Sequence, residues 1–375
     1  MVETEQLRYF AEYIWQDCEG NYRSKTRVCN YEIETGVNRS ILLNKDIYSH
    51  WNYDGSSTGQ AEQNTSEVHL EPIAVYKDPF RGENNVLVLC DIYTLEYYNN
   101  TQNRKYLTPY HDIINKFRGY NNFQPMFGLE QEFFLIDRAT QNPYSTVSSF
   151  NNILTNIKDK IMNSNSHNDY CGVGNINFKI RNYLDLCLKH FHYMELPITG
   201  MNLEVAPSQC EYQICDFGEK AGLGLIIMRY ILIRESENWP FYVSLEPKLK
   251  LNKNMNGSGC HINFSTLDMR NEGGYEEIQN VLSFMSKSPS DEHLKFYGSN
   301  NKERLTGKNE TSHWNHFTIG EGNRGCSIRI PQQTIRDGKG YFEDRRPGAN
   351  MDPLVATHYL FTKYIDYYNQ RQTNI

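Results

Sequence analysis

The sequence predicts an α+β protein, in which a small, strand-rich N-terminal domain precedes a larger domain of mixed helices and strands. Short runs of β-branched and aromatic residues, separated by turn-forming residues, mark the first hundred positions. From Thr108 onward, stretches with helical periodicity alternate with strand-like stretches. The 375 residues, 39% of them hydrophobic, suffice for two domains with a sizeable core. We place the two domains at residues 1–107 and 108–375.

The elements can be placed in order along the chain. In the N-terminal domain we expect strands at Val68–Val75 and Asn85–Tyr93, and the polar stretch Tyr97–Lys105 is predicted to connect the domains. The segments expected in the second domain are a helix at His111–Phe117, a strand at Phe127–Ile136, a long helix at Ile176–Leu196, two short strands within Asn202–Ile214, a helix at Gly218–Glu235, a strand at Gly257–Phe264 and a loop-rich region at Thr306–Ile330.

Composition excludes several classes of function. The formal net charge of −7 offers no basic surface for nucleic acid or an anionic membrane. The most apolar run, Gly222–Ile233, contains Arg229 and is shorter than the roughly 20 residues that span a bilayer, so we expect a buried helix there. The N-terminus lacks the pattern of a secretory signal, and the nine cysteines form no CxxC pair, which favours a reducing, cytoplasmic location. Small-molecule chemistry is the better expectation.

The sharpest local signal is a pair of acids in a strand-like run, Glu130 and Glu132. Residues i and i+2 of a strand point to the same face, roughly 6.5–7 Å apart. Two carboxylates held there beside aromatic residues repel each other and lose solvation, and a hard divalent cation removes both costs. Alternatively, the two acids line a solvated sheet face, which is the commoner situation for an isolated E-x-E pair.

Further potential ligands lie elsewhere in the chain. Glu204 and Glu211 fall on the two short strands, His261 lies in a strand after a glycine-rich approach, and Glu343 lies near the C-terminus. A lone histidine in a strand is more often a hydrogen-bonded core residue than a ligand. Together, however, five carboxylates and one imidazole make an oxygen-rich site for two ions plausible, and that donor set favours Mg²⁺ or Mn²⁺ over zinc.

Arginines are concentrated in the last third of the chain, where Arg304, Arg324, Arg329 and Arg345 occur. The planar guanidinium group binds phosphate and carboxylate in a forked geometry, although any single arginine could equally form a surface ion pair. The sequence has no Walker A motif, so a bound nucleotide would be held by metal ions and arginines instead of a glycine-rich loop.

An ordered set of motifs from about Tyr13 to Pro353 resembles the eukaryotic-type glutamine synthetases. The motifs are WNYDGSSTGQ (Trp51–Gln60), KDPFRG (Lys77–Gly82), GLEQEFFL (Gly128–Leu135), YCGVG (Tyr170–Gly174), NGSGCHINFS (Asn256–Ser265), RLTGKNETS (Arg304–Ser312), NRGCSIRIP (Asn323–Pro331) and GYFEDRRPGAN (Gly340–Asn350). The resemblance implies an N-terminal β-grasp domain and a C-terminal α/β catalytic domain built on antiparallel strands. It also implies a homo-oligomer, expected to be a decamer of two pentameric rings, with active sites between subunits.

The resemblance also implies roles for individual residues. One ion would be bound by Glu132, Glu204 and Glu211, and the other, which also contacts ATP, by Glu130, His261 and Glu343. The resemblance assigns L-glutamate to Asn256, Gly257, Arg304 and Arg345, and ATP to Arg324, Arg329, Ser265 and Tyr341. It assigns ammonium to Asp54 and places Glu310 on the loop that closes over glutamate. The catalytic residues implied are Asp54, Glu310 and Arg324.

The activity implied is ATP-dependent joining of ammonia to the γ-carboxylate of L-glutamate, with Mg²⁺ or Mn²⁺ as cofactors. Two alternatives remain open, an inactive structural relative and a ligase for another small amine. An inactive relative should have lost metal-binding carboxylates or Asp54, and all of them are present. Two residues depart from the family pattern, Met255 where tryptophan is usual and Asn309 where histidine is common.

Overall fold

The computed structural model describes residues 4–36, 38–98, 101–144, 169–173, 178–250 and 255–373. The chain divides into two compact units: unit 1 comprises Met1–Asn115 with Lys189–Glu195, and unit 2 comprises Lys116–Leu188 with Leu196–Ile375. Each unit contains its own β-sheet, and helices accompany them, so the predicted α+β class is confirmed.

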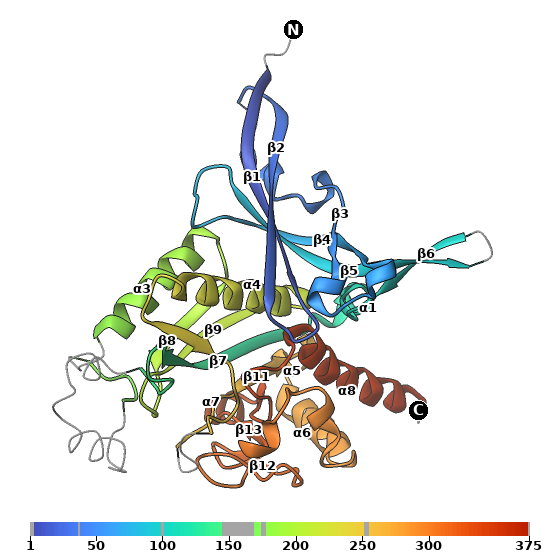
Figure 1. Ribbon diagram of the computed structural model, residues 1–375. Coiled ribbons are helices and arrows are strands. Elements are labelled where there is room, and N and C mark those ends of the chain that lie inside the picture. Colours follow the sequence, from blue (N-terminus) through green and yellow to red (C-terminus); the bar gives the residue numbers. More distant parts are fainter. Residues whose placement is uncertain are drawn as a thin grey trace, which may run out of the picture. The chain divides into compact units, whose positions relative to one another are not determined.

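Unit 1 is built on a six-stranded sheet (Figure 1). Its strands are β1 (Thr4–Gln16), β2 (Tyr22–Glu34), β3 (Trp51–Asp54), β4 (Glu67–Lys77), β5 (Val86–Tyr98) and β6 (Thr101–Tyr106). The strand order is β2-β1-β5-β4-β3, and β6 pairs with β5. The pair β1–β5 is parallel and the other pairs are antiparallel. Buried aromatic and aliphatic side chains, among them Tyr13, Trp15 and Leu70, form the core of this unit.

The two strands predicted in this region are confirmed as β4 and β5, but the predicted connection at Tyr97–Lys105 is wrong. Its residues from Thr101 onward belong to β6, which pairs with β5 from Tyr106 opposite Tyr93 to Thr101 opposite Tyr98. β6 is an edge strand with polar residues. An edge strand exposed to solvent lacks the alternating apolar residues by which a half-buried strand is recognised in a sequence.

Unit 2 is built on an eight-stranded sheet in the order β12-β13-β14-β11-β7-β9-β8, with β10 paired to β7. Its strands are β7 (Met126–Asp137), β8 (Ile198–Leu203), β9 (Gln209–Phe217), β10 (Phe241–Ser244), β11 (Cys260–Ser265), β12 (Ile319–Glu321), β13 (Ile328–Ile330) and β14 (Phe342–Asp344). All of its pairs are antiparallel except β12–β13. The strands predicted around residues 127–136, 202–214 and 257–264 are confirmed as β7, β8 with β9, and β11.

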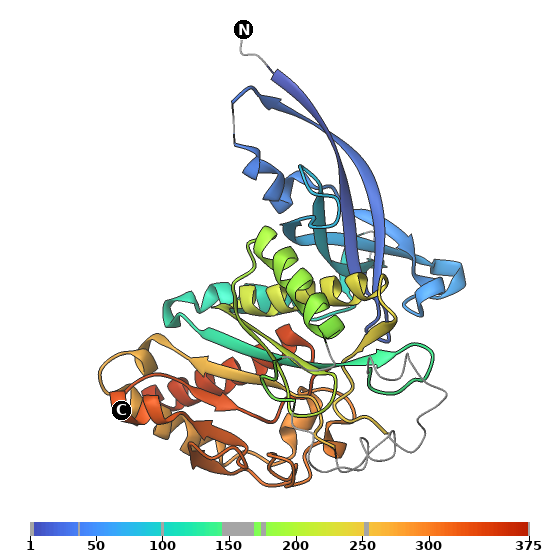
Figure 2. The same cartoon turned by 90° about the vertical axis from the view of Figure 1, so that its left-hand side faces the viewer.

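The helices are α1 (Tyr110–Gly119), α3 (Phe178–Tyr193), α4 (Glu219–Ser236), α5 (Leu267–Arg270), α6 (Gly274–Met285), α7 (Gln332–Asp337) and α8 (Pro353–Thr373). Helix α4 contains the apolar run, and every residue from Ala221 to Leu232 is buried, as predicted. It packs on β7, β9 and β10, and the hydroxyl group of Tyr183 in α3 donates to the carbonyl of Leu232 in α4 (2.6 Å). Figures 1 and 2 show α3 and α4 lying together across these strands. No helix within the described ranges has the length and apolar character needed to cross a membrane.

Candidate metal and substrate site

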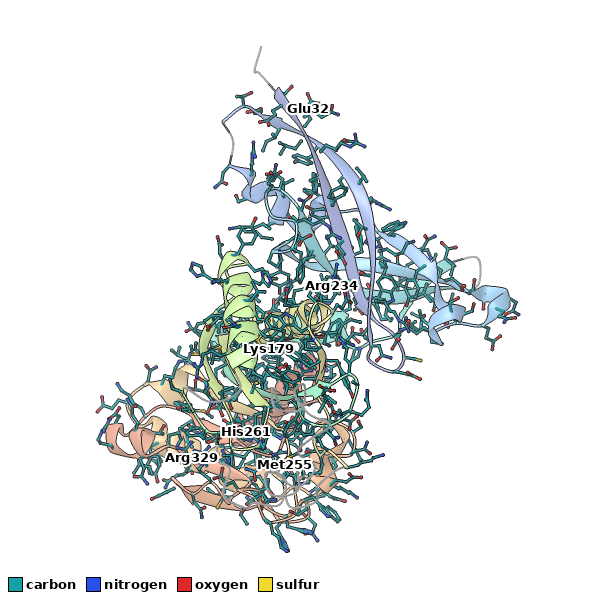
Figure 3. The ribbon with its side chains drawn as sticks, turned by 60° about the vertical axis from the view of Figure 1, so that its left-hand side comes forward. Glu32, Lys179, Arg234, Met255, His261 and Arg329 are labelled. Carbon is teal, nitrogen blue, oxygen red and sulfur yellow. The ribbon has the colours of Figure 1, made fainter. Side chains whose placement is uncertain are left out.

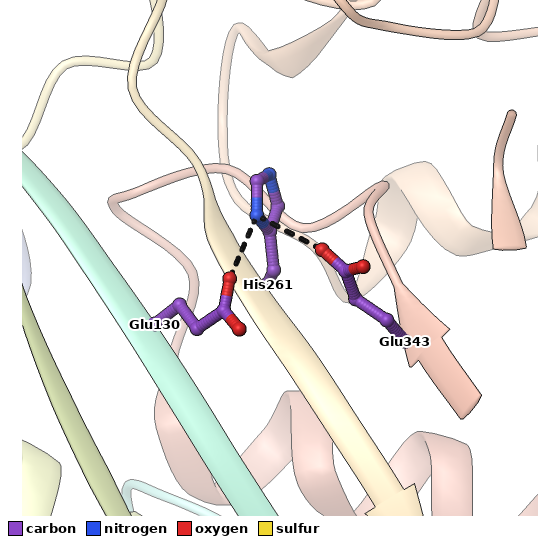
Figure 4. A group of neighbouring side chains, drawn as sticks. All are labelled: Glu130, His261 and Glu343. Carbon is purple, nitrogen blue, oxygen red and sulfur yellow. Dashed lines mark hydrogen bonds and ion pairs between the residues drawn. The ribbon is translucent and has the colours of Figure 1, made fainter. Parts of the chain in front are cut away.

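Three neighbouring strands of unit 2 bring Glu130, His261 and Glu343 together (Figure 4). His261 on β11 lies directly opposite Glu130 on β7, and Glu343 on β14 lies opposite Asn263, two residues along β11. The Nδ1 atom of His261 is 3.3 Å from Oε2 of Glu130 and 3.5 Å from Oε1 of Glu343. Antiparallel register therefore collects three potential ligands that are far apart in the sequence.

The surroundings of this first cluster keep its imidazole neutral. Burial lowers the pKa of His261 well below its ordinary value, and the nearby Arg345 lowers it further. Glu343 is 1% exposed and accepts hydrogen bonds from Nη1 of Arg345 (2.5 Å) and Nη1 of Arg329 (2.8 Å). Figure 3 shows His261 and Arg329 within unit 2. A neutral imidazole beside two carboxylates is a donor set suited to a divalent cation.

The second cluster consists of Glu132, Glu204 and Glu211. Glu132 on β7 lies directly opposite Glu211 on β9, and Glu204 directly follows β8. One carboxylate oxygen from each residue lies within 4.8 Å of the others. Because Glu130 and Glu132 are two residues apart on β7, the two clusters share one face of one strand.

Without a bound ion, the three buried carboxylates of the second cluster destabilise one another's ionised forms. Burial raises the pKa of Glu132 to about 8 and that of Glu211 to about 9, and neighbouring carboxylates add to both shifts. Burial also raises the pKa of Glu204. Among the described residues no ion pair joins these three carboxylates to a cation, and their hydrogen-bond donors are neutral amide groups. Buried acids in this state fit a divalent ion, which would supply the missing positive charge.

The predicted arginines surround the first cluster. Arg329 and Arg345 both contact Glu343, as described above. Arg324 forms an ion pair with Glu310 (Nε to Oε2, 3.4 Å), and Nη2 of Arg345 donates to the Glu310 carbonyl (3.3 Å). Glu310, half exposed, and the preceding Asn309 both have left-handed backbone angles (φ 60° and 53°). The structure thus brings together the arginines and the acid of the predicted closing loop.

Arg304 is held differently from the other arginines. It is 5% exposed and donates from Nη2 to the carbonyls of Arg345 (2.9 Å), Arg346 (2.9 Å) and Pro347 (2.8 Å). Gly257 lies against it, because a Cβ atom at that glycine would be 2.7 Å from Cγ of Arg304. Two of the predicted glutamate-binding positions are therefore in contact.

The other predicted positions lie at the edges of this region or outside it. Ser265, the last residue of β11, accepts a hydrogen bond from Nη1 of Arg270 (2.9 Å), and Tyr341 is 41% exposed immediately before β14. Asn256 precedes Gly257 in the loop before β11. Asp54 belongs to unit 1, where its carboxylate accepts hydrogen bonds from its own turn, from the hydroxyls of Ser56 and Ser57 (both 2.7 Å). These bonds, that from Ser56 foremost, lower the pKa of Asp54.

Sequence reasoning missed the side-chain amides that hold the carboxylates. Asn263 donates to Glu130 (2.7 Å), Asn202 to Glu204 (2.9 Å), Gln213 to Glu211 (2.6 Å) and Gln209 to Glu132 (3.0 Å). All four amides lie two residues from a predicted ligand: Asn202 from Glu204, Gln209 and Gln213 from Glu211 on β9, and Asn263 from His261 on β11. An amide two residues from a potential ligand was a usable signal at Glu204, Glu211 and His261, since residues two apart on a strand share a face.

Comparisons with known proteins point to one family. A family model described as "Glutamine synthetase, catalytic domain" matches residues 111–288. The chain is 38% identical to the glutamine synthetase of Kluyveromyces lactis over 362 residues, covering 92% of this chain and 86% of that protein. It is 37% identical to the glutamine synthetase of Saccharomyces cerevisiae over 365 residues, covering 93% of this chain and 87% of that protein.

A solved structure gives the same result for the fold. The cryo-EM structure of Plasmodium falciparum glutamine synthetase aligns with a TM-score of 0.69, covering 96% of this chain and 72% of that one. The aligned residues are 17% identical, so this likeness concerns the fold.

Proposed function

The chain belongs to the glutamine synthetase family, and from this premise we propose that it is an ATP-dependent glutamate–ammonia ligase. The supporting observation is the pair of adjacent clusters, Glu130–His261–Glu343 and Glu132–Glu204–Glu211, at the centre of one sheet. We assign one divalent ion to each cluster, Mg²⁺ or Mn²⁺. Bound there, the ions would neutralise charge on the phosphates of ATP and on the glutamate carboxylate.

The chemistry requires an activated carboxylate. A γ-carboxylate oxygen of glutamate attacks the γ-phosphorus of ATP, ADP leaves, and a γ-glutamyl phosphate forms. Ammonia then attacks the carbonyl carbon and inorganic phosphate leaves, which gives glutamine. We assign Arg324 and Arg329 to the transferred phosphoryl group, with Ser265 and Tyr341 also contacting ATP, because guanidinium groups bind phosphate oxygens in a forked geometry.

Binding of glutamate is assigned to Asn256, Gly257, Arg304 and Arg345. Asp54 would bind ammonium and help remove its proton, because ammonium is not nucleophilic until it is deprotonated. The hydrogen bonds of its turn lower the pKa of Asp54, so they favour the anionic form that a cation-binding role requires. The loop that carries Glu310 would exclude water, which otherwise hydrolyses the acyl phosphate.

We further propose a homo-oligomeric assembly, a decamer of two pentameric rings, in which Asp54 acts on the site of a neighbouring subunit. The proposed location is the cytoplasm.

The test is ATP- and glutamate-dependent phosphate release, measured with ammonium, with methylamine and without an amine. We expect release that depends on ammonium, with glutamine as the product and with losses in both Glu132→Ala and Asp54→Ala. Release that ignores ammonium, or that survives both substitutions, contradicts the proposal. A preference for methylamine would instead favour a ligase for another small amine.

A further inference from the structure

Gln209 contacts the second cluster but has no assigned role in the chemistry. It is the first residue of β9 and is 2% exposed. Its Nε2 atom donates to Oε2 of Glu132 (3.0 Å) and to the carbonyl of Gly257 (3.1 Å), and the hydroxyl of Ser258 lies 3.5 Å away. One side chain therefore contacts both a proposed ligand of the metal ion and the loop proposed to bind glutamate.

The rest of Gln209 is also fully bonded. Its Oε1 atom accepts from the backbone N–H of Ala206 (3.3 Å), and its backbone carbonyl accepts from the N–H of Glu204 (2.8 Å). Glu211 follows two residues later on the same strand. Gln209 thus connects to Glu132 through its side chain and to Glu204 through its backbone, and it fixes the start of the strand that carries Glu211.

Glu132 depends on these neutral donors for its orientation. Its Oε2 atom accepts from Nε2 of Gln209 and from the backbone N–H of Gly259 (2.8 Å), and its backbone N–H donates to the Gly259 carbonyl (3.0 Å). Two neutral donors therefore hold Oε2 of Glu132. Residues that hold metal-binding carboxylates in this way affect metal affinity by about 10- to 100-fold.

The residue type follows from the bonding. A primary amide is the neutral group that donates two hydrogens from one nitrogen, here to a carboxylate and to a carbonyl, while still accepting a third bond. A glutamate at this position would add a further carboxylate beside Glu132, and a leucine or methionine would leave the Gly257 carbonyl and Glu132 Oε2 without this partner.

We propose that Gln209 is a positioning residue that couples occupation of the second cluster by a metal ion to the placement of the Gly257 loop, and therefore to glutamate affinity. The coupling to glutamate rests on the function proposed above. The amide nitrogen of Gln209 donates to both Glu132 and the Gly257 carbonyl, so an ion that pulls on Glu132 also shifts the donor of the Gly257 carbonyl.

The test compares Gln209→Met with Gln213→Met. Gln213 is a matched control, because it lies on the same strand and donates to Glu211 (2.6 Å) but has no described bond to the Gly257 loop. Mn²⁺ binding is measured directly by electron paramagnetic resonance of free Mn²⁺ without substrates. The KM for glutamate and kcat are then measured at saturating Mn²⁺.

Both variants should bind Mn²⁺ about tenfold more weakly or worse. Only Gln209→Met should also raise the KM for glutamate, by about tenfold, with a smaller change in kcat. An unchanged KM at saturating Mn²⁺ would overturn the coupling, and wild-type Mn²⁺ affinity would overturn the positioning role itself.

Two further arms keep the test decisive. If Gln209→Met does not fold, Gln209→Asn keeps the amide but shortens it by one methylene, and a smaller loss of the same kind is expected in both measurements. If the wild-type chain binds Mn²⁺ but makes no glutamine, the proposed function fails. The Mn²⁺ titrations still decide whether Gln209 positions Glu132.

Discussion

Glu132 is a residue whose burial opposes folding until an ion binds. Its pKa, about 8, lies above the value of an unfolded glutamate, so at neutral pH the unfolded chain is ionised while the folded chain retains a proton. This difference favours unfolding of the ion-free protein. We therefore expect Glu132→Gln to raise the free energy of unfolding of the EDTA-treated protein by about 2 kcal/mol while abolishing tight Mn²⁺ binding.

Thermal denaturation with and without Mn²⁺ checks this prediction. Glu237→Gln is the control, since Glu237 is 60% exposed and pairs with Arg234 at the surface, where such pairs contribute little. An EDTA-treated Glu132→Gln protein that is less stable than wild type would show that this carboxylate supports the fold without an ion.

His293 gives a pH prediction away from the proposed site. It is 1% exposed, and burial, reinforced by Arg346, lowers its pKa to about 4. Acid therefore protonates the unfolded chain first, near its ordinary value of 6.5, so stability falls as the pH drops from about 6.5 to about 4. In His293→Leu the free energy of unfolding should fall less steeply over this window, by up to about 1.4 kcal/mol per pH unit.

Urea titrations at pH 6.5 and 5.0 measure that slope. The packing change introduced by leucine shifts both points together, so it does not alter the comparison. Parallel pH profiles in the two proteins would show that His293 gains its proton in the folded state as readily as in the unfolded one.

Single residues differed in how well the sequence predicted them. Glu130 and Glu132 were identified by two-residue spacing on a strand, and the structure places each in a cluster of three potential ligands. Gln209 and Asn263 were not identified, because the carboxylates that they contact lie on the neighbouring strand β7 and are brought within reach by the strand register. Which arginines approach Glu343 also depended on the pairing of β13 with β14.

Among the elements, the loop that leads into β11 has little space for a side chain at Gly259. A Cβ atom at Gly259 would lie 2.8 Å from Nε2 of His261 and 3.1 Å from Nη1 of Arg304. We expect Gly259→Ala to displace both side chains and reduce glutamine synthesis by at least about tenfold, since misplacement of about 1 Å can cost 100-fold in rate.

Gly119→Ala is the matched control for this prediction. A Cβ atom at Gly119 meets nothing within 4 Å, and its backbone angle suits any residue, so activity should be unchanged. Measured glutamine formation at wild-type rates in Gly259→Ala would mean that the approach to β11 has room that the structure does not show.

Elements with a clear apolar pattern were predicted well, whereas strands whose side chains are largely exposed were not. The helix α4 and the strands β7 and β11 follow from periodicity. The hairpin of β1 and β2 was not placed individually, because many side chains along β2 are exposed or half-exposed and its alternation is weak. β6 was mistaken for a connection for the same reason, since an edge strand carries little apolar signal.

At the scale of the whole molecule, the proposed site combines residues of two subunits. Asp54 lies in unit 1 and both clusters lie in unit 2. If Asp54 serves a neighbouring subunit, Asp54→Ala and Glu132→Ala chains should each be inactive but should complement each other when coassembled. With random mixing, about a quarter of the sites would combine two intact contributions.

Coexpression of the two variants with different affinity tags, followed by tandem purification and the glutamine assay, measures this recovery. Mixing the separately assembled variants without exchange of subunits is the control and should recover nothing. Inactive mixed oligomers would mean that Asp54 and Glu132 must come from the same chain.

The central claim is that two divalent ions bind side by side on the sheet of unit 2. Anomalous diffraction at the manganese edge, on crystals grown with Mn²⁺ and ADP, tests it most directly. Two peaks are predicted, each about 2.2 Å from its ligands. One should contact Glu130, His261 and Glu343, and the other Glu132, Glu204 and Glu211. Manganese absent from both clusters, or bound only elsewhere on the chain, would contradict the account.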